Sequence, residues 1–178
     1  MTGIDTNVLV RYVTRDHPEQ YRAAKRHLES SCTQEEPGYV SVTVLCELAW
    51  VLTSAYEAAG EEVARVIDQV LRTRQLQVQR RDQVRAALAQ QKSSKADFAD
   101  CLIGQLCLEA GADETVTFDQ DAARLRRWRE LDWYVFPLEL GCGALDRPPP
   151  PAEAERFCGL ATSFEQRGPP PLTVLQWK

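Results

Sequence analysis

The pattern of apolar and polar positions changes period repeatedly along the first three quarters of the chain. Short β-branched or apolar runs, typical of strands, are followed by longer stretches with apolar residues three and four positions apart, typical of helices. The pattern predicts strands at a short run ending at Asp5 and at 38–42, 76–79, 114–118 and 133–137. It predicts helices at 6–13, 18–29, 43–52, 60–71, 81–91 and 96–110, and a basic helix around Leu125. Strands alternating with helices indicate an α/β domain, with a parallel sheet covered by helices on both sides.

The chain changes character near its C-terminal end. Four consecutive prolines, Pro148 to Pro151, and three more, Pro169 to Pro171, flank a weakly apolar stretch. Such a composition favours extended chain over a packed core. We therefore expect one folded domain over residues 1–138 and a proline-rich, poorly ordered tail over 139–178, to which no role is assigned.

Composition narrows the class of protein. The 178 residues carry a formal net charge of −5, which excludes a general nucleic-acid coat protein but not an enzyme with an acidic, cation-holding pocket. No apolar run is long enough to cross a membrane, and charged residues such as Asp5 and Arg11 interrupt the N-terminal region. The expected location is therefore the cytoplasm.

The cysteines and histidines indicate neither a metal site nor a catalytic triad. None of the six cysteines forms a C-x-x-C pair, and several lie inside apolar helical patterns, so buried free thiols are expected. Only His17 and His27 are present, which argues against a histidine-rich metal site or a Ser-His-Asp triad.

Acidic residues recur at one kind of position. They follow a predicted strand or lie in the first turns of the helix after it: Asp5, Glu47, Asp97, Asp100 and Asp119. In a parallel sheet these junctions lie at the same edge, where ligands of open α/β sheets bind. We therefore expect carboxylates from distant segments to converge there.

Helix capping is the competing interpretation of several of these acids. Asp5 and Asp97 both stand where an N-cap residue is expected, and Asp121 is expected to cap the basic helix after it. Glu47 and Asp100 are embedded in apolar helical runs, where an acid is costly to bury without a partner. For those two residues a functional role is favoured.

Carboxylates without histidine or thiol partners suit hard divalent cations, above all Mg²⁺, with Mn²⁺ as the second choice. A cation is also expected because four acids in one pocket would otherwise repel one another. The reaction such a site performs best is phosphoryl transfer to water, in which the cation activates the water and stabilises charge on the phosphate.

The acidic segments together resemble the motifs of PIN-domain ribonucleases, and more narrowly those of the VapC toxins of type II toxin–antitoxin pairs. The resemblance covers about residues 2–137 and rests on four segments in the same order: Gly3–Leu9, Glu47 in its apolar helix, Asp97–Ile103 and Thr117–Asp121. It implies a three-layer α/β/α sandwich with a central, mainly parallel sheet. It also implies Mg²⁺-dependent endoribonuclease activity, a homodimer, and inhibition by a VapB-like antitoxin whose C-terminal segment lies across the active site.

The resemblance assigns roles to individual residues. Catalytic and metal-binding roles fall to Asp5, Glu47, Asp100 and Asp119, with Asp97 as a weaker, additional metal ligand. Supporting roles fall to Thr6 and Asn7, which would orient Asp5, and to Thr117 near Asp119. Cys101 and Gly104 depart from the pattern, because small alanines are more usual there.

The substrate-binding residues are the least specific prediction. Arg11 and Arg15, and also Arg80 and Arg81, are candidates for contact with RNA phosphates, although exposed arginines are usually solvated surface residues.

Two other functions compete with the ribonuclease. One is a receiver-like signalling domain that accepts a phosphoryl group on an aspartate; it would need more acids at the first strand and a lysine near the last. The chain has no lysine between Lys95 and Lys178. The other is a catalytically inactive PIN-fold subunit that only binds partners, against which the complete acidic set argues. The sequence does not identify the RNA that is cut or the antitoxin.

Overall fold

The fold was analysed in a computed structural model, which describes residues 1–131. The described residues belong to one compact unit. The strand predicted at 133–137 and the proline-rich tail lie outside the described residues. Within the described part, no helix has the length and apolar character needed to cross a membrane.

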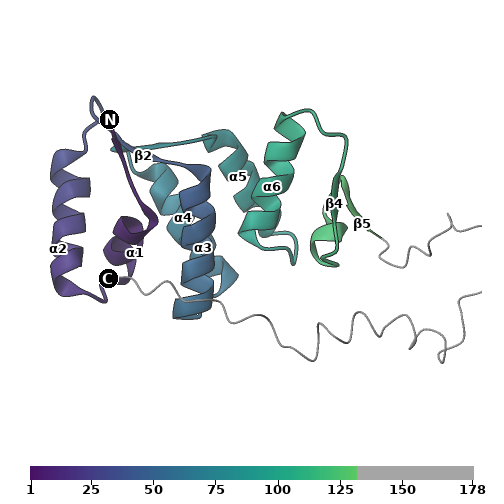
Figure 1. The fold of residues 1–178 in the computed structure, drawn as a ribbon, viewed down its shortest axis with the longest axis horizontal. Coiled ribbons are helices and arrows are strands. Elements are labelled where there is room, and N and C mark those ends of the chain that lie inside the picture. The colour runs from purple at the N-terminus through teal and green to yellow at the C-terminus, as the bar shows by residue number, and fades with distance from the viewer. Residues whose placement is uncertain (132–178) are drawn as a thin grey trace, which may run out of the picture. The chain divides into compact units, whose positions relative to one another are not determined.

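Six α-helices make up most of the described chain (Figure 1). They are α1 (Thr6–Thr14), α2 (Pro18–Arg26), α3 (Val42–Tyr56), α4 (Gly60–Arg72), α5 (Arg81–Gln91) and α6 (Phe98–Glu109). The five strands are β1 (Thr2–Gly3), β2 (Gly38–Val40), β3 (Leu76–Val78), β4 (Thr115–Thr117) and β5 (Trp128–Glu130). A π-helical segment η1 (His27–Ser31) extends α2, and a 3₁₀ turn η2 (Ala122–Arg124) follows β4.

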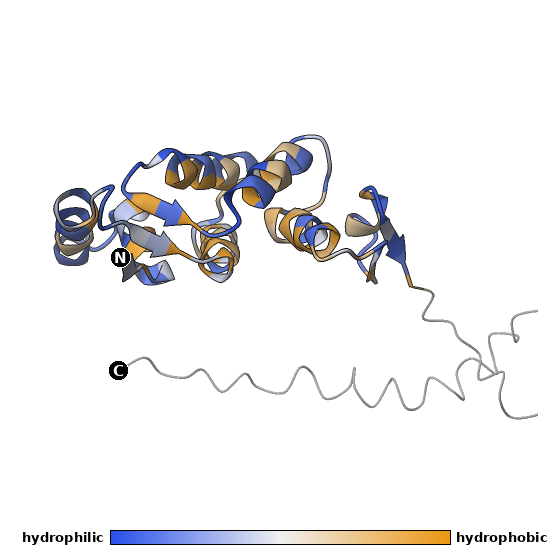
Figure 2. Ribbon diagram, turned by 90° about the horizontal axis from the view of Figure 1, so that it is seen from above, coloured by the Kyte–Doolittle hydropathy of each residue, from blue (hydrophilic) through white to orange (hydrophobic). Residues whose placement is uncertain are grey.

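All strand pairs in the described chain are parallel. The first three strands form one sheet in the order β1-β2-β3, with Tyr39 opposite Gly3 on one side and opposite Gln77 on the other. Helices lie on both sides of this sheet when it is seen from above (Figure 2). The predicted three-layer α/β/α architecture with a parallel sheet is therefore confirmed. β4 and β5 pair with each other in a second, two-stranded sheet.

The hydrophobic core lies between the first sheet and its helices. Figure 2 shows hydrophobic residues concentrated on the strands and on the helix surfaces that face them. The most deeply buried large side chains come from five helices and β2: Leu9, Val40, Leu45, Leu48, Val63, Ile67, Leu71, Val84, Phe98 and Leu102. Their burial stabilises the domain by roughly 1.5–3 kcal/mol for each side chain, and it fixes the helices that carry the candidate acids.

The last part of the described chain differs from the predicted elements. The basic helix expected around Leu125 is only the single 3₁₀ turn η2, and a strand not predicted from the sequence follows at once, β5. The indole of Trp128 in β5 packs against Gly104 of α6, where an added Cβ would stand 2.5 Å from Nε1. Glycine at position 104, a departure from the usual alanine, is thereby explained.

Candidate active site

Asp5 fulfils one of the two roles that the sequence leaves open, that of a helix cap. It is the N-cap of α1, with extended backbone, and it stands between the buried residues Ile4 and Thr6. Its Oδ2 accepts hydrogen bonds from the backbone N–H of Asn7 (3.3 Å) and from Asn7 Nδ2 (3.2 Å). Asn7 therefore orients Asp5 as predicted, and Oδ1 of Asp5 has no protein donor among the described residues.

Thr6 supports a different acid from the predicted one. It is buried, with 3% of its surface exposed, and its Oγ1 donates a hydrogen bond of 2.5 Å to Oε2 of Glu47 on α3. Thr6 is predicted to orient Asp5, but its hydroxyl group is bonded to Glu47 instead. The bond joins the first turn of α1 to the second turn of α3, so it holds Glu47 beside the start of α1.

Asp97 and Asp100 lie at the start of α6, one turn apart. Asp97 is the N-cap of α6, and its Oδ1 accepts a hydrogen bond of 2.8 Å from the backbone N–H of Asp100. Asp97 therefore caps the helix, which is one of the two roles that the sequence predicts for it. Asp100 is partly buried beside the buried residues Cys101 and Leu102.

Asp119 follows β4, and both its backbone N–H and its side chain form hydrogen bonds. Its backbone N–H donates to Oγ1 of Thr117 at 2.9 Å, as the supporting role of Thr117 requires. Its Oδ1 accepts from the backbone N–H groups of Asp121 (2.7 Å) and Ala122 (2.8 Å). Asp121 stands at the predicted N-cap position of η2, but its side chain forms no cap hydrogen bond and pairs with Arg124 at 3.1 Å.

The acids at the start of α6 and the end of β4 interact electrostatically. Burial, together with the negative charges of Asp97 and Asp119, raises the pKa of Asp100 to about 6. Burial also raises the pKa of the Cys46 thiol on α3, with a further contribution from Asp97. α3 and α6 are in contact, and the charge of Asp97 at the start of α6 acts on groups of both helices.

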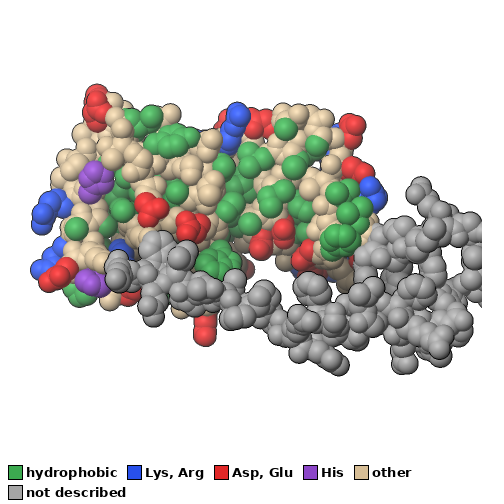
Figure 3. Space-filling model, viewed as in Figure 1, with side chains coloured by type: hydrophobic (Ala, Val, Ile, Leu, Met, Phe, Trp, Pro, Cys, Tyr) green, Lys and Arg blue, Asp and Glu red, His purple; other side chains and the backbone are tan. Residues whose placement is uncertain are grey.

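The candidate acids therefore form two groups. Asp5 and Glu47, linked through Thr6, are called here the α1–α3 acids; Asp97, Asp100 and Asp119 are called the α6–β4 acids. No three histidine, cysteine or acidic side chains within residues 1–131 are close enough together to hold one ion. Figure 3 shows acidic side chains at several separate places on one face. A hydrogen bond thus connects Thr6 to one of the α1–α3 acids, and electrostatic effects connect the α6–β4 acids.

The donor chemistry of both groups fits a hard divalent cation. Every candidate ligand is a carboxylate, and four of the five have one oxygen fixed by a protein donor and the other without one in the described chain: Asp5, Glu47, Asp97 and Asp119. Oxygen ligands held in this way suit Mg²⁺ or Mn²⁺. The raised pKa of Asp100 marks the place where a cation would relieve the most repulsion.

The two arginines predicted to bind substrate already have protein partners. Arg11 Nη1 forms an ion pair of 2.5 Å with Asp16, and Arg11 Nε donates to Gln20 at 2.7 Å. The guanidinium of Arg15 lies over the ring of Tyr21, 5.2 Å from its centroid. Hydrogen bonds from Tyr56 and Arg11 lower the pKa of Asp16 to about 2, so the Arg11 ion pair persists at neutral pH. Arg11 is therefore engaged in joining α1 to the end of α3.

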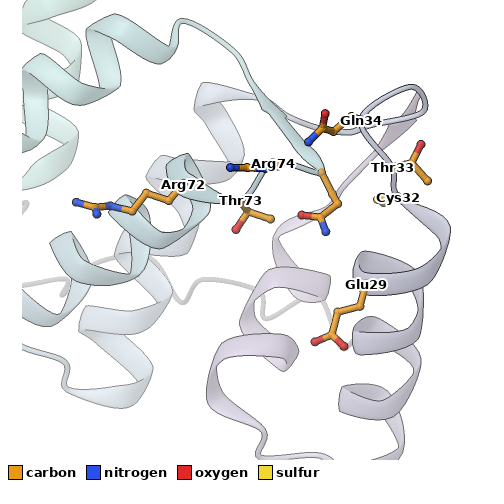
Figure 4. A pocket seen from close by; sticks show the side chains of 8 residues that line it. Glu29, Cys32, Thr33, Gln34, Arg72, Thr73 and Arg74 are labelled. Carbon is orange, nitrogen blue, oxygen red and sulfur yellow. The ribbon is translucent and has the colours of Figure 1, made fainter.

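A polar hollow of about 510 Å³ lies away from all of these acids. Its walls come from η1, the end of α4 and the loops before β2 and β3: Glu29, Cys32, Thr33, Gln34, Arg72, Thr73, Arg74 and Gln75. Its labelled side chains point in different directions and do not converge (Figure 4). The hollow lies at the amino ends of β2 and β3, whereas ligands of α/β sheets favour the carboxyl ends. It is not the candidate site.

Comparison with known proteins agrees with the acidic segments. The family model described as PIN domain matches residues 4–127, well over half of the chain, and the match contains all five candidate acids. No curated protein matches the chain. The chain belongs to the PIN domain family.

Proposed function

We propose that this protein is a metal-dependent endoribonuclease and the toxic component of a VapBC-like type II toxin–antitoxin system. PIN domains are generally nucleases, and the match includes every candidate acid. The observation that carries the proposal is the placement of Asp100. Its carboxyl group is partly buried and faces Asp97 and Asp119, an arrangement that is unfavourable unless a cation binds there.

The proposed ligands are the predicted ones. Asp5, Glu47, Asp100 and Asp119 would hold Mg²⁺, or Mn²⁺ in its place, with Asp97 as a weaker ligand. A divalent cation at such a site supplies charge that acidifies a water molecule and stabilises the phosphate during hydrolysis. Asn7, Thr6 and Thr117 fix the carboxylates of Asp5 and Glu47 and the backbone of Asp119, so that ligand oxygens are oriented before the cation arrives.

Partners and location follow from the resemblance to VapC toxins. We infer an RNA substrate, a homodimer, and a VapB-like antitoxin acting in the cytoplasm. A short upstream gene encoding a DNA-binding antitoxin would support this biological role.

The test is cleavage of RNA by Asp5→Asn and Glu47→Gln variants in the presence of Mg²⁺. Loss of a ligand charge should lower the rate at least ~100-fold, because a carboxylate binds the cation far better than an amide does. Asp121→Asn is the matched control: it removes an acid near Asp119 that pairs with Arg124, and should leave the rate within a factor of about two. Undiminished cleavage by Asp5→Asn or Glu47→Gln would refute the proposed site.

A second candidate function is a catalytically inactive PIN-fold interaction subunit. The absence of three converging acidic, histidine or cysteine side chains among the described residues favours it. Titration calorimetry with Mn²⁺ distinguishes the two functions: the ribonuclease requires binding that is lost in Asp100→Asn, and the inactive subunit requires none. Membership in the PIN family does not favour the receiver-like alternative.

A further inference from the structure

An exposed aromatic ring stands directly beside one of the candidate acids. Phe118 is the residue before Asp119, and 64% of its surface is exposed. Phe118 directly follows Thr117, the last residue of β4, and Val116 within β4 is 46% exposed, so two exposed apolar side chains stand at this end of the strand. Neither residue belongs to the hydrophobic core.

This exposed side of β4 and β5, called here the outer face, points away from α6. Trp128, on the opposite face, packs against Gly104 of α6. Arg129 pairs with Val116 in the strand register and therefore lies on the outer face with it. Figure 3 shows a hydrophobic patch over the region where Figure 1 draws these two strands.

The segment next to the outer face is basic. Residues 122–129 contain four arginines and no acid, in a chain whose net charge is −5. Arg124 and Arg129 pair with Asp121 and Glu114. Arg126 and Arg127 are exposed and form no ion pair within the described chain.

Arg126 and Arg127 lie at the opposite end of β4 from Phe118. Arg127 adopts a left-handed backbone conformation, with φ of 65°, and its carbonyl accepts a hydrogen bond of 2.8 Å from the N–H of Thr115. The two arginines therefore stand beside the start of β4. At roughly 3.3 Å per residue they are on the order of 10 Å from Phe118.

We propose that the outer face is a subsite for single-stranded RNA. Phe118 stacks on a base next to the phosphate that is cleaved, and Arg126 and Arg127 contact the RNA backbone farther along the same strand. This inference rests on the proposed ribonuclease function and names where its substrate lies. Aromatic stacking combined with free cations is the way proteins hold single strands without reading their sequence.

A protein partner fits the outer face less well. The centres of protein interfaces are depleted of charged residues. Here the two exposed apolar side chains lie within or directly after β4, and two exposed arginines beside the start of β4 complement a polyanion.

The experiment measures binding of a short single-stranded oligoribonucleotide that carries a fluorescent adenine analogue at successive positions. The protein is the full chain with Asp5→Asn, which keeps the RNA uncut. Stacking on Phe118 should quench the analogue at one position. Phe118→Leu keeps an apolar side chain but removes the aromatic face, and should abolish that quenching and weaken binding by roughly 5- to 150-fold. Phe118→Trp keeps an aromatic face and should retain both the quenching and the binding affinity.

The arginines are tested by the salt dependence of the same binding reaction. Arg126→Gln should weaken binding and lower the slope of log affinity against log salt by about 1, the value for one lost phosphate contact. Arg65→Gln is the matched control, because Arg65 is an exposed arginine on α4; it should leave both quantities unchanged.

Two results would overturn the RNA subsite, and a third would separate it from the proposed catalytic function. Equal binding and quenching with Phe118→Leu would overturn the subsite. Unchanged RNA binding together with loss of self-association in Phe118→Leu, measured by sedimentation, would also overturn it and assign the face to a protein contact. Position-specific quenching by the Asp5→Asn protein, with no RNA cleavage by the unmodified protein, would support the subsite while refuting the proposed catalytic function.

Discussion

The α1–α3 acids and the α6–β4 acids differ in how each group holds its negative charge. Asp5 and Glu47 are each bonded to a neutral donor, Asn7 and Thr6, and the buried hydroxyl of Thr6 ties the two helices together. In the second group, burial and the charges of Asp97 and Asp119 raise the pKa of Asp100 to about 6. The first group is organised without a cation, whereas the second is strained electrostatically until one binds.

The largest expected effect concerns the packing that supports the α6–β4 acids. In Gly104→Ala the new methyl group would stand 2.5 Å from Trp128 Nε1, so the indole must move out of its packed position against α6. We expect a loss of about 1–3 kcal/mol in the free energy of unfolding, measured with urea. Gly60→Ala is the control, because its Cβ would meet only Gln91 Nε2, at 3.4 Å. Equal stability of the two variants would show that the Trp128 contact does not hold β5 in place.

The next effect concerns the α1–α3 acids. Thr6→Val keeps the shape of the side chain but removes the donor to Glu47, and should cost about 0.5–1.5 kcal/mol of stability. Mn²⁺ affinity, measured by calorimetry, should fall roughly tenfold, because Glu47 is no longer oriented. Thr53→Val in α3 is the control: Thr53 donates only to the carbonyl of Ala49. A Thr6→Val protein with normal Mn²⁺ affinity would contradict the positioning role.

The smallest effect is the pH dependence caused by Asp100. Its folded-state pKa of about 6 lies above the ordinary 3.8, so between these values the folded chain keeps a proton that the unfolded chain has released. Stability contributed by this group therefore falls as the pH rises from about 4 to about 6. Asp100→Asn removes this loss and should be more stable than the unmodified protein by about 1 kcal/mol at pH 7.5, after allowance for solvent screening.

The same comparison at pH 4 should show almost no difference between the two proteins. Added Mg²⁺ should stabilise only the unmodified protein at pH 7.5. Urea denaturation at both pH values checks this. A difference that stays constant with pH would mean that burial and the charges of Asp97 and Asp119 do not raise the pKa of Asp100.

The sequence predicted the fold well because its helices depend on local signals. Asp97 begins α6 and Gly111, with φ of 89°, ends it, and both are recognisable as cap residues. The apolar spacing of Leu45, Leu48 and Leu52 likewise identifies the buried face of α3.

Contacts between distant residues could not be predicted in this way. Thr6 was paired with its neighbour Asp5, whereas its actual partner Glu47 is 41 positions away. β5 was missed because Trp128, Arg129 and Glu130 form a strand only beside β4. The acids themselves were predicted as one cluster; the pairing of β4 with β5, in a sheet separate from β1–β3, accompanies their division into two groups.

The network around Arg11 has a mechanical consequence. At one end α1 and α3 are joined by Thr6 and Glu47; at the other, Arg11 and Tyr56 both bind Asp16, just beyond the end of α1. Two helices that are joined by side-chain hydrogen bonds at both ends move together as one rigid unit. Among the described residues no side-chain hydrogen bond or ion pair joins α6 or β4 to α1 or α3, so a small displacement of α6 and β4 breaks no such bond.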